Sequence, residues 1–292
     1  MRTRKDGELS EREVVFLVGL AQFVNILDFM IVLPLGPDYA AELGIATSRL
    51  GVVGGSYTAA AAVAGVAAAR YLDRFDRRIA LALTLLGLVV GTVAAGFATS
   101  LATLLGARVL AGAFGGPATA IGLSVVSDLV PVERRGKALG AVMGAFAIAS
   151  VVGVPLGLEL GRRFGWRFPL FAVAALGLLV LAGVVARLPS LRGHLTSSRA
   201  VVRPLVLLRK PGTLAAVAAT MSISLAGFAI IPNVSAYLQA NCNFPREHLG
   251  LLYLAGGLPT LNETAARRGR ARWRGREADD VVRRGLWSLT SS

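Results

Sequence analysis

The sequence predicts an all-α membrane protein, and three observations lead to this fold class. The 292 residues are 54% hydrophobic, with a mean hydropathy of +0.63. Only 16% are charged, whereas charged residues make up about a quarter of a typical soluble domain. The apolar residues form continuous runs rather than stripes, and the runs reach the roughly 20 residues that a helix needs to cross a bilayer.

The predicted spans follow one another closely along the chain. They cover about 14–36, 51–69, 79–97, 101–126, 138–160, 168–187 and 213–240, and another begins at 248–258. We therefore divide the chain into an N-terminal segment (1–13), a six-helix half (14–187), a polar linker (188–212), the start of a second half (213–258) and a tail (259–292). The first span lacks an A-x-A-like cleavage site, so we expect it to be a retained helix and not a signal peptide.

Basic residues lie mainly in alternate loops. Seventeen Lys and Arg residues flank one set of span ends and five flank the other set. Because cytoplasmic loops carry the excess of Lys and Arg, this predicts a multi-pass inner (cell) membrane protein with a cytoplasmic N-terminus. The net charge of +14 is shared among these loops and not gathered on one soluble face, which argues against nucleic-acid binding.

A loose internal repeat crosses the linker. Residues 31–39 leave the first span as I-V-L-P-L-G-P-D-Y and lead into Leu50-Gly51, and residues 230–237 leave the seventh as I-I-P-N-V-S-A-Y and lead into Leu249-Gly250. The two passages are about 199 residues apart, which indicates a direct repeat of a six-helix unit. The alternative is a coincidence between two similar helix exits.

The composition of the tail differs from that of the preceding spans. Residues 259–292 hold eight arginines and no long apolar run, although an eighth span has just begun. A helix that ends halfway through a bilayer leaves backbone groups unpaired. We therefore expect a reading-frame shift or truncation near residue 258, with a genuine basic tail as the alternative.

Polar side chains inside the first span are candidates for chemistry. Gln22, Asn25 and Asp28 are spaced by three residues and share one stripe of the helix. An intramembrane charge costs about 2.5–3.5 kcal/mol on insertion scales, so Asp28 needs a function or a partner. It is either a proton-binding carboxylate beside a substrate cavity or a carboxylate fixed between helices. Arg108 in the fourth span is either the partner that holds Asp28 or another acid ionised, or a side chain that snorkels to the membrane edge.

Two clusters of small residues predict close helix packing. Gly112 and Gly116 lie four residues apart in the fourth span, and Gly153 and Gly157 share a face of the fifth span on either side of Pro155. Such glycines allow helices to approach closely, and the proline removes a backbone hydrogen bond and bends its helix. The pattern fits a hinge in a part that rocks, or packing alone.

The loop after the second span is the densest charge cluster between two spans. It contains Asp73, Arg74, Arg77 and Arg78. We interpret it either as a positive-inside topology determinant or as an ion-pair latch that forms in one conformation and breaks in another.

These motifs resemble those of the major facilitator superfamily, and within it the bacterial proton-coupled drug and sugar efflux antiporters. The family loop between spans two and three reads G-x-L-A-D-R-x-G-R-K, and residues 69–78 read A-R-Y-L-D-R-F-D-R-R, which keeps the acid and the basic positions but lacks both glycines. The family motif R-x-x-x-G of span four is met by Arg108 and Gly112.

Span five matches the family's antiporter motif, G-x-x-x-G-P-x-x-G-G, in outline only. Gly153, Pro155 and Gly157 are present, but one residue separates the usual Gly-Pro pair. Residues 131–138 and 165–167 are also similar to family sequences, and the resemblance covers about residues 12–257.

The resemblance implies a fold and a function. It implies twelve spans in two six-helix halves, of which this chain contains the first half and the first one to two helices of the second. Substrate is then held between the halves and moved by alternating access. Asp28, Asn25, Gln22 and Arg108 become substrate- or proton-binding residues, with Arg108 the proton-relay partner of Asp28. The cytoplasmic latch becomes Asp73, Arg74, Arg77 and Arg78.

The implied partners are a small molecule such as a drug or sugar, protons and the lipid bilayer, with no cofactor and no metal. A homodimer is expected if the second half is missing. The alternative is a non-transporting membrane protein, such as a partner subunit or scaffold, or an inactive truncated product. An enzyme is not expected, because His194 and His248 lie in loops 54 residues apart and no intramembrane Ser-His or paired-Asp arrangement is present.

Overall fold

The computed structural model describes residues 10–71 and 75–191, with a few scattered positions between 212 and 245. Its long helices are α1 (Glu11–Val32), α3 (Leu50–Tyr71), α4 (Arg77–Gly96), α5 (Leu101–Leu129) and α9 (Arg167–Arg187). Between α5 and α9 a helix runs in four pieces, α6 (Val132–Met143), α7 (Ala145–Ile148), the π-helical segment η3 (Ala149–Gly153) and α8 (Val154–Phe164). The short helix α2 (Gly36–Leu43) and the 3₁₀ turn η1 (Thr47–Arg49) connect α1 to α3.

The first six predicted spans are present. Within the described residues, six helices are long and apolar enough to cross a membrane, which confirms the all-α membrane fold class. The first helix ends at Val32 and not near residue 36, because Pro34 has no backbone N–H to continue it. The fifth begins at Val132, six residues before the predicted start, because its charged first turn continues the helix beyond the apolar run. The seventh and eighth spans, most of the linker and the tail lie outside the described residues.

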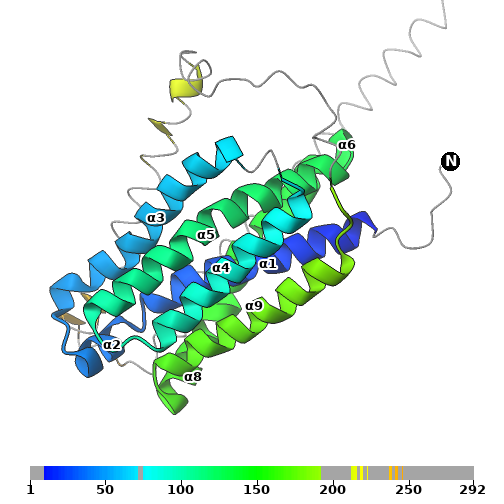
Figure 1. Ribbon diagram of the computed structural model, residues 1–292. Coiled ribbons are helices and arrows are strands. Elements are labelled where there is room, and N and C mark those ends of the chain that lie inside the picture. The colour runs from blue at the N-terminus through cyan, green and yellow to red at the C-terminus, as the bar shows by residue number, and fades with distance from the viewer. Residues whose placement is uncertain are drawn as a thin grey trace, which may run out of the picture.

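The helices lie side by side along a common direction, with α1 in the middle of the bundle (Figure 1). α1 packs against α5, α9 and the α6–α8 helix, whereas α3 packs almost entirely on α5. α4 lies between α5 and α9. We call the end at which α1 begins the N-terminal end of the bundle. There Arg134 pairs with Glu11 at 3.1 Å, and Arg77 pairs with Asp128 at 3.2 Å.

Glycines on α5 bring α3 into backbone contact. A Cβ atom at Gly112 would lie 2.2 Å from the carbonyl oxygen of Tyr57, and one at Gly116 would lie 2.3 Å from that of Ala61. Only a residue without a side chain fits at such a distance. The pair Gly112 and Gly116, identified in the sequence by its spacing, therefore sets the distance between α3 and α5.

The fifth span packs against α1 in the same way, beside an irregular turn. Cβ atoms at Gly153 and Gly157 would lie 2.7 Å and 2.3 Å from the side chains of Leu27 and Ile31 of α1. The π-helical turn η3 ends at Gly153, and Pro155 lies in the first turn of α8. A π turn and a proline are both recognised causes of helix bending, so the local geometry of a hinge is present at this position.

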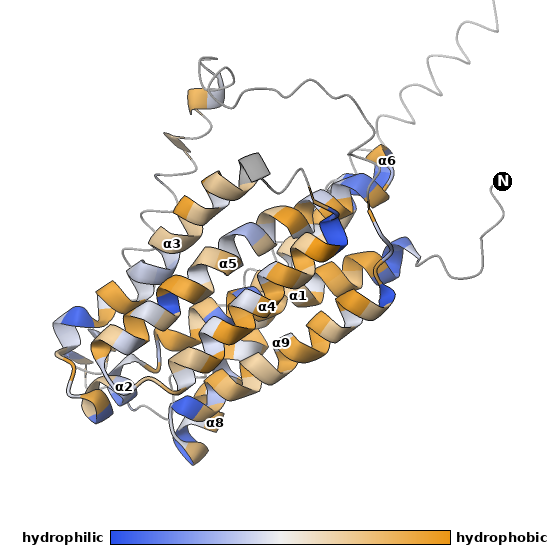
Figure 2. Ribbon diagram, in the orientation of Figure 1, coloured by the Kyte–Doolittle hydropathy of each residue, from blue (hydrophilic) through white to orange (hydrophobic). Residues whose placement is uncertain are grey.

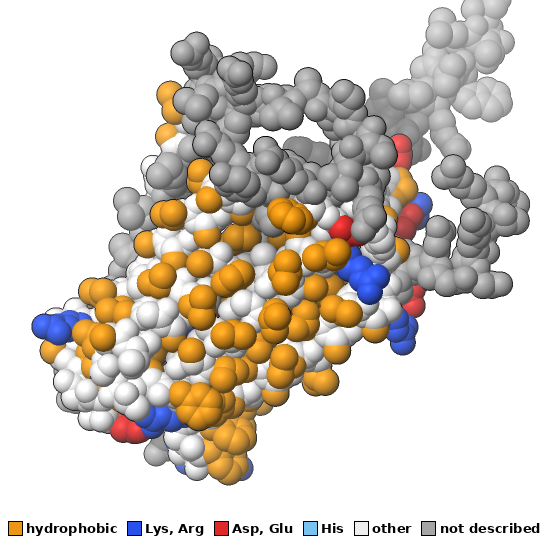
Figure 3. Space-filling model, in the orientation of Figure 1, with side chains coloured by type: hydrophobic (Ala, Val, Ile, Leu, Met, Phe, Trp, Pro, Cys, Tyr) orange, Lys and Arg blue, Asp and Glu red, His pale blue; other side chains and the backbone are white. Residues whose placement is uncertain are grey.

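The surface matches a hydrocarbon environment. Hydrophobic residues dominate the sides of the bundle, and charged residues gather at its two ends (Figures 2 and 3). Large apolar side chains are widely exposed on the long helices, for example Phe16, Val66 and Leu179. Exposure of this extent is expected where lipid and not water covers the protein.

Candidate functional site

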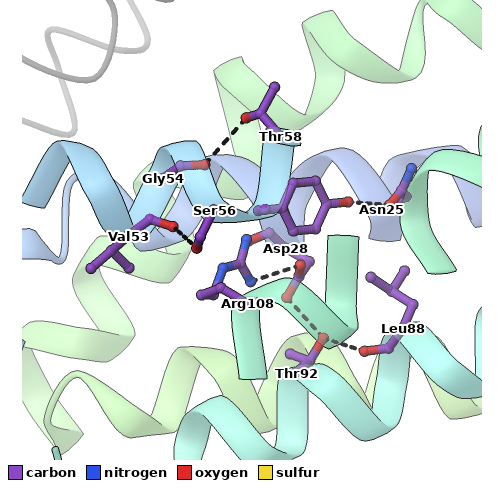
Figure 4. Close-up of polar contacts among 10 residues, drawn as sticks. Asn25, Asp28, Val53, Gly54, Ser56, Thr58, Leu88, Thr92 and Arg108 are labelled. Carbon is purple, nitrogen blue, oxygen red and sulfur yellow. Dashed lines mark hydrogen bonds and ion pairs between the residues drawn. The ribbon is translucent and has the colours of Figure 1, made fainter. Parts of the chain in front are cut away.

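A buried ion pair forms the centre of the bundle. Arg108 of α5 donates from Nη1 to Asp28 Oδ2 of α1 at 2.9 Å, and both residues have 0% exposed surface (Figure 4). The guanidinium also donates from Nη2 to the Asp28 backbone carbonyl at 3.4 Å. Arg108 therefore points into the bundle and does not snorkel to the membrane edge, and the two intramembrane charges predicted to be candidates are brought together.

The carboxylate has a second partner on a third helix. Thr92 of α4 donates its hydroxyl to Asp28 Oδ1 at 2.8 Å, and this hydroxyl also lies 2.8 Å from the Leu88 carbonyl of the preceding turn (Figure 4). Each carboxylate oxygen is thus bound by a different helix. Removing two charges from water costs several kcal/mol per ion, and such a pair is tolerated only when its remaining hydrogen-bonding capacity is satisfied.

One of the three guanidinium nitrogens of Arg108 has no partner among the described residues. Its Nε is buried and has no hydrogen-bond partner within the described part of the chain. A guanidinium presents five N–H groups in a fixed fork, and buried donors are almost always paired. The guanidinium can therefore donate to a further acceptor at Nε, such as a ligand oxygen.

Tyr57 of α3 connects the ion pair to the polar stripe. Its ring lies under the Arg108 guanidinium, 4.6 Å from Cζ to the ring centroid, and its hydroxyl donates to Asn25 Oδ1 at 2.6 Å. Gly115 makes room for this arrangement, because a Cβ there would lie 2.2 Å from the tyrosine hydroxyl. A cation over an aromatic face is attracted by about 2 kcal/mol when desolvated, so Tyr57 holds Arg108 in position independently of the carboxylate.

The polar stripe of α1 faces the interior of this half. Asn25 donates from Nδ2 to the Gly115 carbonyl at 3.0 Å and to the Thr119 hydroxyl at 2.9 Å, both on α5. Gln22 is also buried, at 9% exposure, but it lies outside this hydrogen-bonded network among the described residues. The stripe therefore meets partner helices of the six-helix half and is not left facing lipid.

Sequence reasoning missed Tyr57, Thr92 and Thr119. Hydroxyl side chains occur in most of these helices, and they satisfy themselves by bonding to the carbonyl of the preceding turn. Nothing in the spacing of Thr92 separates it from Thr84, whose hydroxyl bonds only to carbonyls of its own helix. Only the packing of α3 and α4 on α1 and α5 identifies the network.

The structure describes two of the four residues of the predicted latch, Arg77 and Arg78. Asp73 and Arg74 lie outside the described residues, so their role stays a prediction. Arg77 donates from Nε to Asp128 of α5 at 3.2 Å, and Arg78 donates to the Val185 carbonyl of α9. These basic residues tie the start of α4 to the ends of α5 and α9, and Asp128 is a partner that the motif did not indicate.

A second charged cluster closes the opposite end of the bundle. Glu42 of α2 accepts hydrogen bonds from the Trp166 indole at 2.8 Å and from Arg167 of α9. The hydrogen bond from Arg167, followed by that from Trp166, holds the pKa of Glu42 below its ordinary value of 4.5. Arg167 also donates to the Ala98 carbonyl at 3.0 Å. The cluster therefore joins α2, the start of α9 and the turn between α4 and α5 at this end of the bundle. Nowhere do the described residues group His, Cys, Asp or Glu side chains as a metal site would require.

Comparison with known proteins assigns the architecture. A sequence profile of the Major Facilitator Superfamily matches residues 18–266, which is most of the chain. The chain belongs to the major facilitator superfamily. Membership identifies it as a multi-pass membrane protein of a transporter family and not an enzyme.

Relatives in the superfamily are named for different substrates. The chain is 31% identical over 255 residues to the purine ribonucleoside efflux pump NepI of Escherichia coli, which covers 86% of this chain and 62% of that protein. It is 30% identical over 131 residues to a triacylglyceride transporter of Mycolicibacterium hassiacum, which covers 42% of this chain and 24% of that protein. The chain therefore spans less than two thirds of the length of the curated superfamily relatives that it matches.

Solved structures of the superfamily have the same fold. A bacterial homologue of the human lysosomal transporter Spinster, in an inward-facing and unoccupied conformation, matches with a TM-score of 0.69 at 19% identity over 88% of this chain and 60% of the other. The inward-open xylose transporter XylE of Escherichia coli matches with a TM-score of 0.55 at 17% identity over 74% and 56%. At these identities the likeness establishes the fold alone.

Proposed function

We propose that the chain provides the proton-coupling half of a secondary active transporter that expels a small molecule by alternating access. The observation that carries the proposal is the Asp28–Arg108 ion pair, whose two members are fully buried in the interior of a membrane bundle. Ionisable groups at this depth are rare and mark substrate or proton pathways.

The geometry supports a simple coupling step. When Asp28 is ionised, it accepts from Arg108 and Thr92 and joins α1, α4 and α5. When Asp28 binds a proton, its attraction for the guanidinium weakens, while the Tyr57 ring keeps Arg108 nearby. Protonation therefore changes the strength of the contact between helices and frees donors of Arg108 for a substrate oxygen.

The motion that accompanies this step is proposed to use the fifth span. Its π-helical turn, followed by Pro155, forms a local irregularity beside α1. A hinge of this kind lets one part of a helix tilt without unfolding the other. The predicted latch, with Arg77 paired to Asp128, would control the same transition at the N-terminal end.

Topology and membrane are part of the proposal. We infer that the N-terminal end faces the cytoplasm and that the protein resides in the inner membrane, because Lys and Arg are concentrated on that side. Residues 188–212 then form a cytoplasmic linker to the start of a second half at 213–258.

The substrate class to test first is suggested by a relative that aligns with most of the chain. NepI is a purine ribonucleoside efflux pump and aligns with 86% of this chain. Purine ribonucleosides are therefore the first candidates, followed by sugars and lipophilic drugs. A small molecule rich in hydroxyl and ring-nitrogen acceptors would also suit the spare donor of Arg108.

The test is substrate-dependent proton movement. The chain is reconstituted into liposomes that contain a pH-sensitive dye, a pH gradient is imposed, and each candidate substrate is added. We expect proton flux with one substrate class and loss of that flux in Asp28→Asn. We expect retention in Glu159→Gln, a matched change of a partly exposed acid whose partners among the described residues are Arg162 and Arg163 of its own helix.

Two results would argue against the proposal. Undiminished flux in Asp28→Asn would remove Asp28 from the coupling mechanism. Absence of flux with every substrate class, from protein that is folded and correctly inserted, would favour the non-transporting alternative.

A further inference from the structure

A groove runs along the N-terminal half of α1. It has a volume of about 610 Å³ and lies between α1 and the α6–α7 helix, close to the N-terminal end of the bundle. One wall is the apolar face of α1, formed by Val15, Phe16, Leu20 and Phe23. None of Gln22, Asn25 and Asp28 lines the groove, so it is separate from the buried ion pair.

Small residues keep the groove open. Its second wall is an alanine stripe of the fifth span, with Ala138, Ala141 and Ala145. On α1, Gly19 lines the groove, and a Cβ built there would meet no atom within 4 Å. Gly19 thus differs from Gly153 of the same helix pair, where a Cβ would lie 2.7 Å from Leu27, because Gly19 borders open space and does not serve packing.

The mouth of the groove is positively charged. Arg12, Arg134 and Lys137 line it together with one acid, Glu11, which pairs with Arg134 at 3.1 Å. The rim therefore carries a net charge of about +2, and neither Arg12 nor Lys137 has an ion-pair partner in the described ranges 10–71 and 75–191. Both side chains are exposed and can turn toward a ligand.

The dimensions fit one leaflet of a bilayer. From Glu11 to Phe23 the wall of α1 extends about 18 Å at 1.5 Å per residue. The hydrocarbon core of a membrane is about 30 Å thick, so one leaflet has a depth of roughly 15 Å. A lipid whose headgroup lies at the charged mouth would place an acyl chain along the apolar length of the groove.

We propose that this groove binds an anionic phospholipid, with the phosphate at Arg12, Arg134 and Lys137 and one acyl chain against Gly19 and Phe23. Basic pockets between transmembrane helices are the places where acidic lipid headgroups bind. The anionic charge distinguishes this occupant from an uncharged lipid, for which the three cations would have no use. The proposal is independent of the transport mechanism, because no residue of the ion-pair network lines the groove.

The test compares retained lipids by native mass spectrometry. The chain, purified in mild detergent, is incubated with equal amounts of phosphatidylglycerol and phosphatidylcholine of the same acyl chains. We expect one tightly held phosphatidylglycerol per chain. In Gly19→Leu the new side chain fills the groove, so bound phosphatidylglycerol falls to background. The matched control is Gly65→Leu on α3, where a Cβ also meets nothing within 4 Å, and we expect it to retain lipid like the unmodified chain.

The headgroup contribution is tested at the exposed rim. The double variant Arg12→Gln, Lys137→Gln removes two cations without touching the apolar walls. Each cation near an anionic lipid contributes about fivefold to binding, so the preference for phosphatidylglycerol should fall about 25-fold. Circular dichroism of every variant verifies that the helix content is unchanged.

Three results would overturn the proposal. Equal retention of the two lipids by the unmodified chain would remove the anionic requirement. Unchanged phosphatidylglycerol binding in Gly19→Leu would place the lipid elsewhere. A lipid-free dimer that dissociates in Gly19→Leu would show that a second copy of the chain fills the groove.

Discussion

Removal of Arg108 should be among the most damaging single changes in the bundle. In Arg108→Met the Asp28 carboxylate remains at 0% exposure and loses the guanidinium at 2.9 Å, with only Thr92 left as a side-chain donor. Breaking a buried ion pair by deleting one partner costs about 3–5 kcal/mol in free energy of unfolding. For a domain of this size about 2–4 °C is lost per kcal/mol, so the melting temperature should fall by roughly 6–20 °C.

The double variant Asp28→Leu, Arg108→Met gives the decisive comparison. Replacing both members of a buried pair by apolar groups of similar volume is often neutral or stabilising, because neither charge then remains buried without a partner. We therefore expect the double variant to recover most of the stability that Arg108→Met loses. The assay is thermal unfolding in mild detergent, followed by circular dichroism of the helices.

Two outcomes would refute this reasoning. A melting temperature of Arg108→Met equal to that of the unmodified chain would mean that the carboxylate is solvated or neutral without its partner. Additive losses in the double variant would mean that the two side chains stabilise the bundle separately and not as a pair.

Three further predictions concern the surroundings of this pair and the ends of the bundle. Tyr57→Phe keeps the ring under the guanidinium but leaves the buried Asn25 Oδ1 without its donor, so it should cost about 1–3 kcal/mol in free energy of unfolding. Tyr57→Leu also removes the ring and should cost about 2 kcal/mol more, and thermal unfolding separates the two. Gly112→Val should prevent α3 from docking and lower the yield of monodisperse protein in size-exclusion chromatography, whereas Gly106→Ala, with open space around its Cβ, should be neutral or slightly stabilising. The pKa of Glu42 is lowered in the folded state, so its stabilisation is present above about pH 4.5 and is lost as the pH falls through the folded-state pKa. The melting-temperature difference between the unmodified chain and Glu42→Gln should therefore be present at pH 7 and shrink below pH 4.5.

The helices could be predicted from the sequence because each is a continuous apolar run that has no other way to satisfy its backbone in a membrane. The same reasoning identified Asp28 and Arg108, since a charge within such a run is conspicuous. It proposed Arg108 as a partner of Asp28 or of another acid, but it could not choose between these or exclude snorkelling, because the two residues are 80 apart and lie on helices with many possible neighbours. The spacing of Gly112 and Gly116 predicted a close contact, but only the structure identifies α3 as the helix that fills it.

Several polar contacts join residues far apart in the chain and cannot be predicted from the local sequence. Tyr57 lies on α3 between small residues, and its hydroxyl reaches Asn25 across the bundle. Asp76 stands where the family loop has a glycine, and it caps α4 through Arg78 N at 2.9 Å while accepting from Leu191 N at 3.0 Å. The sequence placed Asp76 in a charged loop but indicated neither of these contacts, and the roles of both residues follow from long-range packing.

The burial of the ion pair also determines which helix must move if Asp28 exchanges a proton. Asp28 and Arg108 have no exposed surface, so water can reach them only after a neighbouring helix shifts. Around the pair, α4 and α5 are held at both ends, by Arg77–Asp128 at one end and by Arg167 with Ala98 at the other. α3 is different, because only 17% of its membrane-spanning stretch is buried, compared with 61% for α4. It packs mainly on α5, at the glycines of that helix. It is therefore the least enclosed of the four helices around the pair. It also carries Tyr57, so displacement of α3 would uncover the guanidinium and open the carboxylate to water in a single movement.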